Sequence, residues 1–124
     1  MKLLCVVTAS IESVTGLALI ASPTQTSSLL LGTALDAPSG LVIARMTGAA
    51  LIALSAACWS ARDGGPSRAN RGLVVALLGY NAAAVIVLAH ARLGLGLSGL
   101  GLWPAVVLHT GLGSWCLASL RRRA

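Results

Sequence analysis

The stretch VVTASIESVTGLALI, residues 6–20, decides the fold of this chain. It is apolar or small almost throughout, and its middle holds Glu12, one of only three acidic residues in the chain. A bilayer core of about 30 Å requires about 20 apolar residues in a helix. Extended to residues 3–21, the stretch therefore predicts a helix that crosses a membrane and carries a carboxyl group inside it.

The composition of the whole chain is that of a membrane protein. Of its 124 residues, 56% are hydrophobic and 10% are charged, and the mean hydropathy is +0.88. A soluble domain carries roughly 25% charged residues, and a domain of this size buries only about two-thirds of its surface. A core this small cannot hold so much apolar surface, so a bilayer is the expected solvent.

Four apolar runs are long enough to cross a bilayer, at roughly residues 3–21, 41–61, 72–91 and 103–120. Breaks that contain Pro or Gly separate them, such as RDGGPSRANR in the loop 62–71. Pro104 suits the first turn of the last helix, where its missing N–H costs nothing, and Trp103 suits the membrane interface. The expected fold is all-α: an integral membrane four-helix bundle that forms a single domain, residues 1–124.

Two segments between these runs are expected to lie at the membrane surface. In the loop 22–40, the sequence SSLLLGTAL predicts a short interfacial helix capped by Ser27 or Ser28. The Leu/Gly alternation at residues 93–102 is typical of a strand. An isolated strand leaves its backbone groups unpaired at a membrane, so a close turn is expected there instead.

The basic residues are distributed unequally between the two ends of the expected bundle. The end that holds both termini and the loop 62–71 has Lys2, Arg62, Arg68, Arg71, Arg121, Arg122 and Arg123. The opposite end has only Arg45 and Arg92. Loops on the cytoplasmic side carry the excess of Lys and Arg. The predicted topology is therefore up-down-up-down, with both termini and the loop 62–71 cytoplasmic and the loop 22–40 extracytoplasmic.

The sequence lacks the features that are typical of nucleic-acid-binding proteins and of several classes of enzyme. The net charge of +6 comes from short basic clusters between apolar runs, and Phe is absent. No basic groove with interleaved aromatic residues results, so no nucleic-acid partner is expected. No phosphate-binding loop, G-x-S-x-G or H-E-x-x-H motif is present, so no catalytic residue is assigned and an enzyme is not favoured.

Several polar side chains fall near the middle of the expected bilayer when residues are counted from the cytoplasmic end at about 1.5 Å each. These are Glu12, Tyr80, Asn81 and His109. Thr8 shares a helix face with Glu12 and Gly16, and small residues such as Gly48 mark a face of the second helix. Small residues let helix backbones approach, so these faces are expected to meet in the bundle interior.

Arg45 is the expected partner of Glu12. A charge at mid-bilayer costs at least about 2.5–3.5 kcal/mol, and Arg45 cannot lose its charge. A Glu12–Arg45 pair on the first two helices would satisfy both groups, with Asn81 or His109 completing the hydrogen bonds. The predicted buried polar cluster is thus Glu12, Arg45, Asn81 and His109, with Tyr80 and Thr8 as accessory members. Two interpretations stay open: a lock for helix packing, or a proton relay, substrate site or ion pathway.

No metal or cofactor is expected. His90 and His109 could be considered as the two axial ligands of a haem. They differ by roughly 10 Å in height along the helices, whereas one haem iron needs both ligands at the same level. Cys5, Cys58 and Cys116 fall at similar depths, which leaves a thiol site as a lesser alternative. No C-x-x-C or Cys/His spacing supports such a site.

The ordered segments TGLALIASP, LLLG, ARMTGAALIAL, GYNAA and LWPAVVLHTGL resemble those of small, uncharacterised four-helix bacterial membrane proteins. More distantly, the chain is similar to the DoxX-like group. The resemblance runs along nearly the whole chain and implies a multi-pass protein of the bacterial inner (plasma) membrane. DoxX-like proteins are linked to respiratory or redox complexes, which implies an accessory-subunit role. No ligand set of that group maps onto residues of this chain.

The sequence leaves three functions open. The first is an interaction protein: an accessory subunit of a membrane complex, or a homo-oligomer, whose partners are the lipid bilayer and other membrane subunits or its own copies. The second is a minimal proton-coupled or small-molecule transporter that uses Glu12, Arg45 and His109, although four helices enclose little volume. The third is a membrane redox protein that binds quinone or haem.

Overall fold

Residues 1–121, which the computed structural model describes, form an all-α structure without a strand. Its five helices are α1 (Lys2–Ala21), α2 (Pro23–Leu31), α3 (Pro38–Ala61), α4 (Arg68–Leu93) and α5 (Leu102–Arg121). Within the described residues, three of them, α1, α3 and α4, are long and apolar enough to cross a membrane. Helix α5 has 20 residues, and its apolar run contains Pro104, His109 and several Gly and Ser residues.

The helices α3 and α4 begin earlier than the sequence pattern predicts. Pro38 occupies the first turn of α3, where its missing N–H leaves no hydrogen bond unmade. At the start of α4, the Ser67 Oγ accepts a hydrogen bond of 3.1 Å from the Asn70 backbone N–H. This is a side-chain N-cap, and it extends the helix into the basic loop sequence.

Helix α2 lies within the segment expected to hold an interfacial helix, but it begins at Pro23 rather than at Ser27 or Ser28. Its N-cap is Ser22 and its C-cap is Gly32, whose φ of 77° is the left-handed conformation that glycine adopts readily. The Thr26 Oγ1 donates hydrogen bonds to carbonyl oxygens of the preceding chain, including that of Ala18 at 3.1 Å. Helix α2 is thereby attached to the end of α1.

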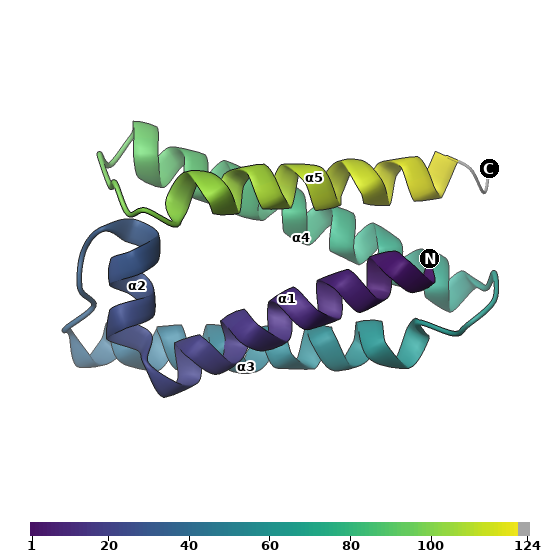
Figure 1. Ribbon diagram of the computed structural model, residues 1–124, viewed down its shortest axis with the longest axis horizontal. Helices are drawn as coiled ribbons and strands as arrows, with labels where there is room; N and C mark the ends of the chain where they lie inside the picture. Colours follow the sequence, from purple (N-terminus) through teal and green to yellow (C-terminus); the bar gives the residue numbers. More distant parts are fainter. Residues whose placement is uncertain (122–124) are drawn as a thin grey trace.

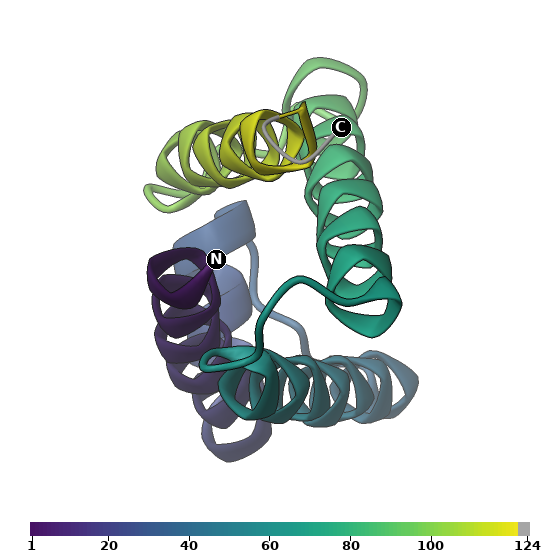
Figure 2. The ribbon, with the colours of Figure 1, turned by 90° about the vertical axis from the view of Figure 1, so that its right-hand side faces the viewer.

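The four long helices run lengthwise through the molecule and alternate in direction, so that α1 begins and α5 ends at the same end (Figure 1). Figure 2 shows that they form two pairs, α1 with α3 and α4 with α5. The backbones of α1 and α3 are in close contact at Gly16 and Gly48. A Cβ atom on Gly16 would lie 2.7 Å from the Gly48 carbonyl oxygen, and one on Gly48 would lie 2.6 Å from that of Gly16.

The two pairs are joined at both ends of the molecule. Near the start of α1 an apolar core draws on all four long helices and comprises Leu4, Cys5, Ala9, Cys58, Val74, Leu77, Leu112 and Cys116. At the other end, the Gly101 N–H donates to the Leu29 carbonyl of α2 at 2.9 Å. A Cβ atom on Gly99 would collide with the Leu30 carbonyl. The Leu/Gly segment therefore forms a close connection to α2 and no strand.

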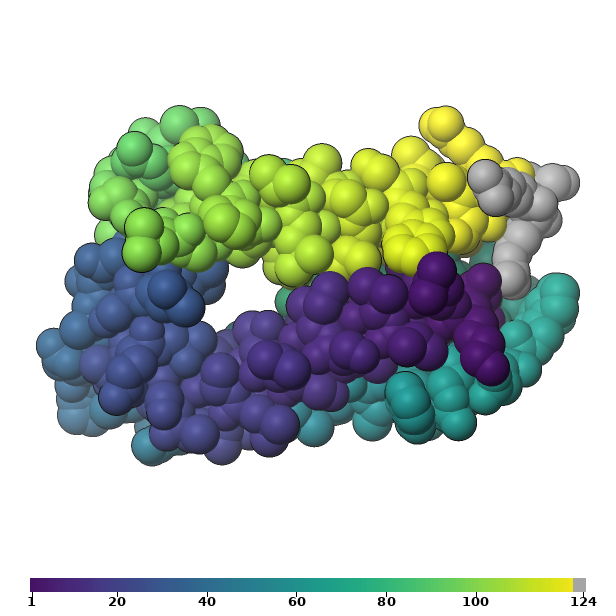
Figure 3. Space-filling model, viewed as in Figure 1, coloured from purple at the N-terminus to yellow at the C-terminus, as the bar shows by residue number. Residues whose placement is uncertain are grey.

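Between these two joined ends the helix pairs part. The space-filling view shows an opening beside α2, between the C-terminal half of α1 and the N-terminal half of α5 (Figure 3). The polar residues of interest lie near the middles of α1, α4 and α5.

The outer surface is apolar along the lengths of the long helices. Each long helix has large apolar side chains that are more than half exposed. Examples, with their exposed fractions, are Val14 (70%), Ile43 (66%), Ile86 (68%) and Val107 (69%). A soluble monomer rarely leaves such a large contiguous apolar surface in water. The surface is therefore suited to contact with lipid or with other apolar helices.

Candidate functional site

The polar residues midway along the helices form two hydrogen-bonded pairs. The Tyr80 hydroxyl of α4 donates to the Glu12 Oε2 of α1 at 3.1 Å. The His109 Nδ1 of α5 lies 2.8 Å from the Asn81 Oδ1 of α4. Glu12 and Asn81 are 2% and 1% exposed, respectively. We call these four residues the polar cluster; it connects α1 to α4 and α4 to α5.

The hydrogen bonds of Asn81 determine which ring nitrogen of His109 carries a hydrogen. The Asn81 Nδ2 donates to the Leu77 carbonyl at 2.8 Å, so the other side-chain atom is the oxygen and accepts. The His109 Nδ1 must then carry the hydrogen that it donates. In the neutral ring this leaves Nε2 as an acceptor.

Tyr80 lies between the two pairs. Its ring meets the His109 ring edge-on, with the ring centres 5.5 Å apart and the planes at 85°. This arrangement is favourable for aromatic rings. The four side chains therefore form one continuous group across three helices, and the Tyr80 ring lies in its middle.

Arg45 is not a member of this group, and the predicted Glu12–Arg45 pair does not form. The Arg45 side chain is exposed, and its Nε donates to the Ile20 carbonyl at 3.4 Å. It thus binds a carbonyl in the last turn of α1, as basic side chains near helix C-termini often do. The phenol of Tyr80, expected only as an accessory member, takes the place of Arg45 beside Glu12.

Thr8 and Glu12 each have a buried oxygen without a partner. Thr8 is 1% exposed and lies one turn before Glu12 on the same face of α1. Within residues 1–121, Thr8 Oγ1 and Glu12 Oε1 are the two buried side-chain oxygens that make no hydrogen bond. Buried polar atoms are nearly always paired, so two orphans on one face mark this position as unusual.

The ion pairs of the described residues lie away from Glu12, at the end where α1 begins. The Lys2 Nζ lies 2.8 Å from Asp63 Oδ1, and the Arg62 Nε lies 3.2 Å from Asp63 Oδ2. The hydrogen bond from Lys2 and the nearby positive charges lower the pKa of Asp63. The Arg62 guanidinium also lies 4.3 Å from the centre of the Trp59 ring. Charged and aromatic groups therefore gather at this end of the molecule.

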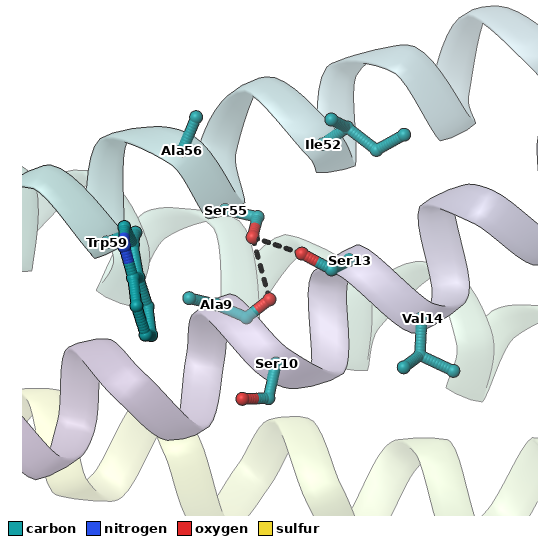
Figure 4. Close-up of a pocket in the computed structure, with 8 residues that line it drawn as sticks. All are labelled: Ala9, Ser10, Ser13, Val14, Ile52, Ser55, Ala56 and Trp59. Carbon is teal, nitrogen blue, oxygen red and sulfur yellow. Dashed lines mark hydrogen bonds between the residues drawn. The ribbon is translucent and has the colours of Figure 1, made fainter.

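A groove of about 530 Å³ lies on the outer face between α1 and α3 (Figure 4). It is lined by Ala9, Ser10, Ser13, Val14, Ile52, Ser55, Ala56 and Trp59. The hydroxyls of Ser13 and Ser55 form a hydrogen bond with each other. Because the Ser55 hydroxyl donates its hydrogen to the Ala9 carbonyl at 2.7 Å, Ser13 must be the donor in the bond between the two serines. The sequence analysis did not predict this pair. The available signal was that Ser13 and Ser55 are polar residues within apolar runs.

A second groove, of about 370 Å³, lies between α4 and α5. Asn81 and His109 contribute to its wall beside small and hydroxyl-bearing residues that include Ala82, Gly113 and Ser114. The His109–Asn81 side of the polar cluster therefore borders a groove that is open to the outside. Glu12 lies on the other side, within the contact between the helix pairs.

Of the remaining candidates, the two histidines do not come together, whereas the three cysteines do. His90 is exposed on α4, whereas His109 is partly buried and bonded to Asn81. The three cysteines lie in the apolar core. Within residues 1–121, no three His, Cys, Asp or Glu side chains are grouped so that they could hold a metal ion.

The polar cluster and the two grooves lie on α1, α3, α4 and α5. Of these helices, α1, α3 and α4 are long and apolar enough to cross a membrane. In comparisons with known proteins, no family model matches the chain, and no curated protein or solved structure matches it.

Proposed function

We propose that this chain is a small multi-pass protein of the bacterial inner membrane in which α1, α3, α4 and α5 cross the bilayer. Three of these helices meet the requirements of a span, and α5 packs along α4 with a length of 20 residues. Arg62 follows α3, Arg68 and Arg71 lie in the first turn of α4, and all three are at the same end as Lys2. The positive-inside rule then places both termini in the cytoplasm.

This topology is tested by adding one cysteine at a time in exposed loops. The three native cysteines are buried, so an added thiol is the accessible one. Ala34→Cys should react with a membrane-impermeant maleimide in intact spheroplasts. Gly65→Cys should react only after lysis. The reverse pattern would contradict the proposed orientation, and equal labelling of both before lysis would contradict membrane spanning.

The proposed activity is interaction: the chain serves as an accessory subunit that receives a transmembrane helix of a partner subunit. The observation that carries this proposal is the groove between α4 and α5, whose lining combines large apolar side chains with the small residues Ala82 and Gly113 and the hydroxyls of Thr110 and Ser114. Helices associate in bilayers through close packing at small residues and through side-chain hydrogen bonds. The resemblance to the DoxX-like group supports the same role.

Neighbouring alanines on α4 offer a matched test of this proposal. Ala82 lines the groove and Ala83 does not, yet both are exposed. The Ala82→Leu variant should lose its partner after extraction in mild detergent, whereas Ala83→Leu should retain it. Native mass spectrometry identifies the assembly and separates a different subunit from a second copy. A wild-type protein that is always extracted as a monomer would contradict the proposal.

A minimal proton-coupled carrier is the second candidate, and the observation that favours it is the buried Glu12 carboxyl with an unpartnered oxygen. An ionisable residue inside a span is a functional candidate by default. Purified protein reconstituted in vesicles should then move protons or a co-substrate, and Glu12→Gln should abolish that flux. Equal flux with both proteins, or none with the wild type, would exclude the carrier.

A further inference from the structure

Glu12 is a carboxyl group without a counter-charge. Within the described residues, no Lys, Arg or His nitrogen lies within 4.0 Å of its oxygens. The titratable side chains around it are those of Tyr80 on α4, His109 beyond the Tyr80 ring on α5, Cys58 on α3, and Cys5 on its own helix. Its Oε2 accepts a hydrogen bond from the Tyr80 hydroxyl.

An ionised Glu12 would therefore be a buried and unpaired negative charge. Glu12 lies in the middle of α1, which runs from Lys2 to Ala21. Under the proposed membrane topology it lies near the bilayer centre, where an unpaired charge is strongly unfavourable. A bound cation would remove this charge, and the simplest such cation is a proton.

The groups at the site favour a proton over a metal ion. Thr8 Oγ1 and Glu12 Oε1 are the unpartnered buried oxygens there. A metal ion such as Mg²⁺ or Ca²⁺ takes about six or more oxygen ligands, and α-helical backbone carbonyls at mid-helix are already used within the helix. A proton requires one carboxyl oxygen, and Glu12 Oε1 is available to hold it.

We propose that Glu12 is a proton-binding site, in which Oε1 carries the proton while Oε2 accepts the hydrogen bond from Tyr80. The proton comes from water and forms the O–H bond of a neutral carboxylic acid; its release regenerates the carboxylate. The neutral acid allows α1 to pack against α4 and α5. Release of the proton requires water to reach Glu12, and the opening between α1 and α5 shows where the helix pairs are already apart (Figure 3).

This proposal rests on the proposed membrane topology only for the depth of Glu12. Its burial and its lack of a counter-charge are properties of the fold itself. Maleimide labelling of the two loop cysteines tests the topology, whereas the protonation of Glu12 is tested on the side chain directly. The two proposals can therefore fail separately.

The test uses dicyclohexylcarbodiimide, an apolar reagent that partitions into membranes and adds to protonated carboxyl groups. The carboxylic acid adds across a C=N bond of the reagent, and the adduct rearranges to a stable N-acylurea. Full-length wild-type protein in lipid vesicles is treated at neutral pH, digested and analysed by mass spectrometry. We expect one stable adduct, on the α1 peptide that contains Glu12, and no adduct on the peptides that contain Asp36 or Asp63, which are exposed.

The expected labelling decreases as the pH rises, because only the protonated form reacts. A Glu12→Gln variant, whose amide resembles the neutral acid, should fold and remain unlabelled on this peptide. Because the primary measurement is made on the wild type, it does not depend on the folding of a variant. Absence of an adduct on Glu12 at neutral and mildly acidic pH, with the protein intact in vesicles, would overturn the proposal.

Discussion

The Tyr80 hydroxyl of α4 donates a hydrogen bond of 3.1 Å to the Glu12 carboxyl of α1, although the two residues are 68 positions apart in the chain. This is the polar contact that links the α1–α3 pair to the α4–α5 pair at mid-length. Glu12 is 2% exposed and has no basic partner within the described residues. The hydroxyl of Tyr80 therefore adds a polar contact between the two pairs at the buried acid.

Removing this hydroxyl should destabilise the fold. In Tyr80→Phe, the Glu12 Oε2 loses its donor and joins Oε1 as an unpaired buried atom. A buried acceptor without a partner costs about 1–3 kcal/mol, so the unfolding midpoint in detergent should fall. Thr110→Val is the control, because its hydroxyl is exposed and bonds only within its own helix. Equal stability of Tyr80→Phe and the wild type would show that the Tyr80–Glu12 hydrogen bond does not stabilise the fold.

The crossing of α1 and α3 should not tolerate even a methyl group. In Gly16→Ala the new Cβ atom would lie 2.7 Å from the Gly48 carbonyl oxygen, so the helices must move apart. Overpacking of this kind costs about 1–3 kcal/mol. Gly79→Ala on α4 meets no atom within 4 Å and should leave the melting temperature unchanged or slightly raised. Thermal unfolding of both variants in the same detergent compares them, and similar destabilisation would argue against a close crossing.

Acid should weaken the contact between the start of α1 and the end of α3. The Lys2 hydrogen bond and the neighbouring charges lower the pKa of Asp63 from its ordinary value of 3.8. A carboxyl whose pKa is lowered in the folded state contributes stability above its ordinary pKa and loses it as the pH falls through the folded-state value. The effect should be small because the pair is exposed and screened.

The unfolding midpoint measured against pH checks this contribution. Below pH 3.8, the ordinary value for Asp63, the wild type should lose a small increment of stability that Asp63→Asn lacks at every pH. Asp36→Asn is the control, because Asp36 forms no ion pair within residues 1–121. If Asp63→Asn and the wild type show the same dependence on pH, the Lys2–Asp63 contact contributes nothing to folding.

Ionisation of Glu12 should expose the buried core thiols. Cys58 and Cys116 are both fully buried where the helix pairs meet. If alkaline pH separates α1 from α4 and α5, a small maleimide should react with them faster in the wild type than in Glu12→Gln at the same pH. An ionised Glu12 disfavours the thiolate of Cys58, so a faster reaction in the wild type reports separation of the helices and not a more reactive thiol. If the wild type and Glu12→Gln react with the maleimide at identical rates across the pH range, the ionisation of Glu12 does not affect helix packing.

The positions of the long helices could be predicted from the sequence because the length of an apolar run limits where a span fits. The expected ranges 3–21 and 103–120 lie within α1 and α5. The start of α2 was missed because Ser22 and Pro23, which begin it, were interpreted as part of a break. A proline is typical both of a loop and of the first turn of a helix.

Depth along a helix was easier to predict than rotation about its axis. Residue counting placed Tyr80 and His109 level with Glu12, and the structure groups them. The Glu12–Arg45 pair is expected because each charge needs a partner on an adjacent helix, but in the helices that cross at Gly16 and Gly48 the Arg45 side chain is exposed. The angle of that crossing depends on the packing of the whole pair, which a local pattern does not encode.

The most direct test of the protonated Glu12 is the infrared spectrum of the protein in lipid vesicles at neutral pH. A neutral carboxylic acid has a C=O stretching band that a carboxylate lacks, and the band shifts in heavy water. We expect this band in the wild type and in Tyr80→Phe, and its absence in Glu12→Gln. A wild-type spectrum without the band, from protein whose helical content matches that of the variants, would contradict the central claim that Glu12 binds a proton.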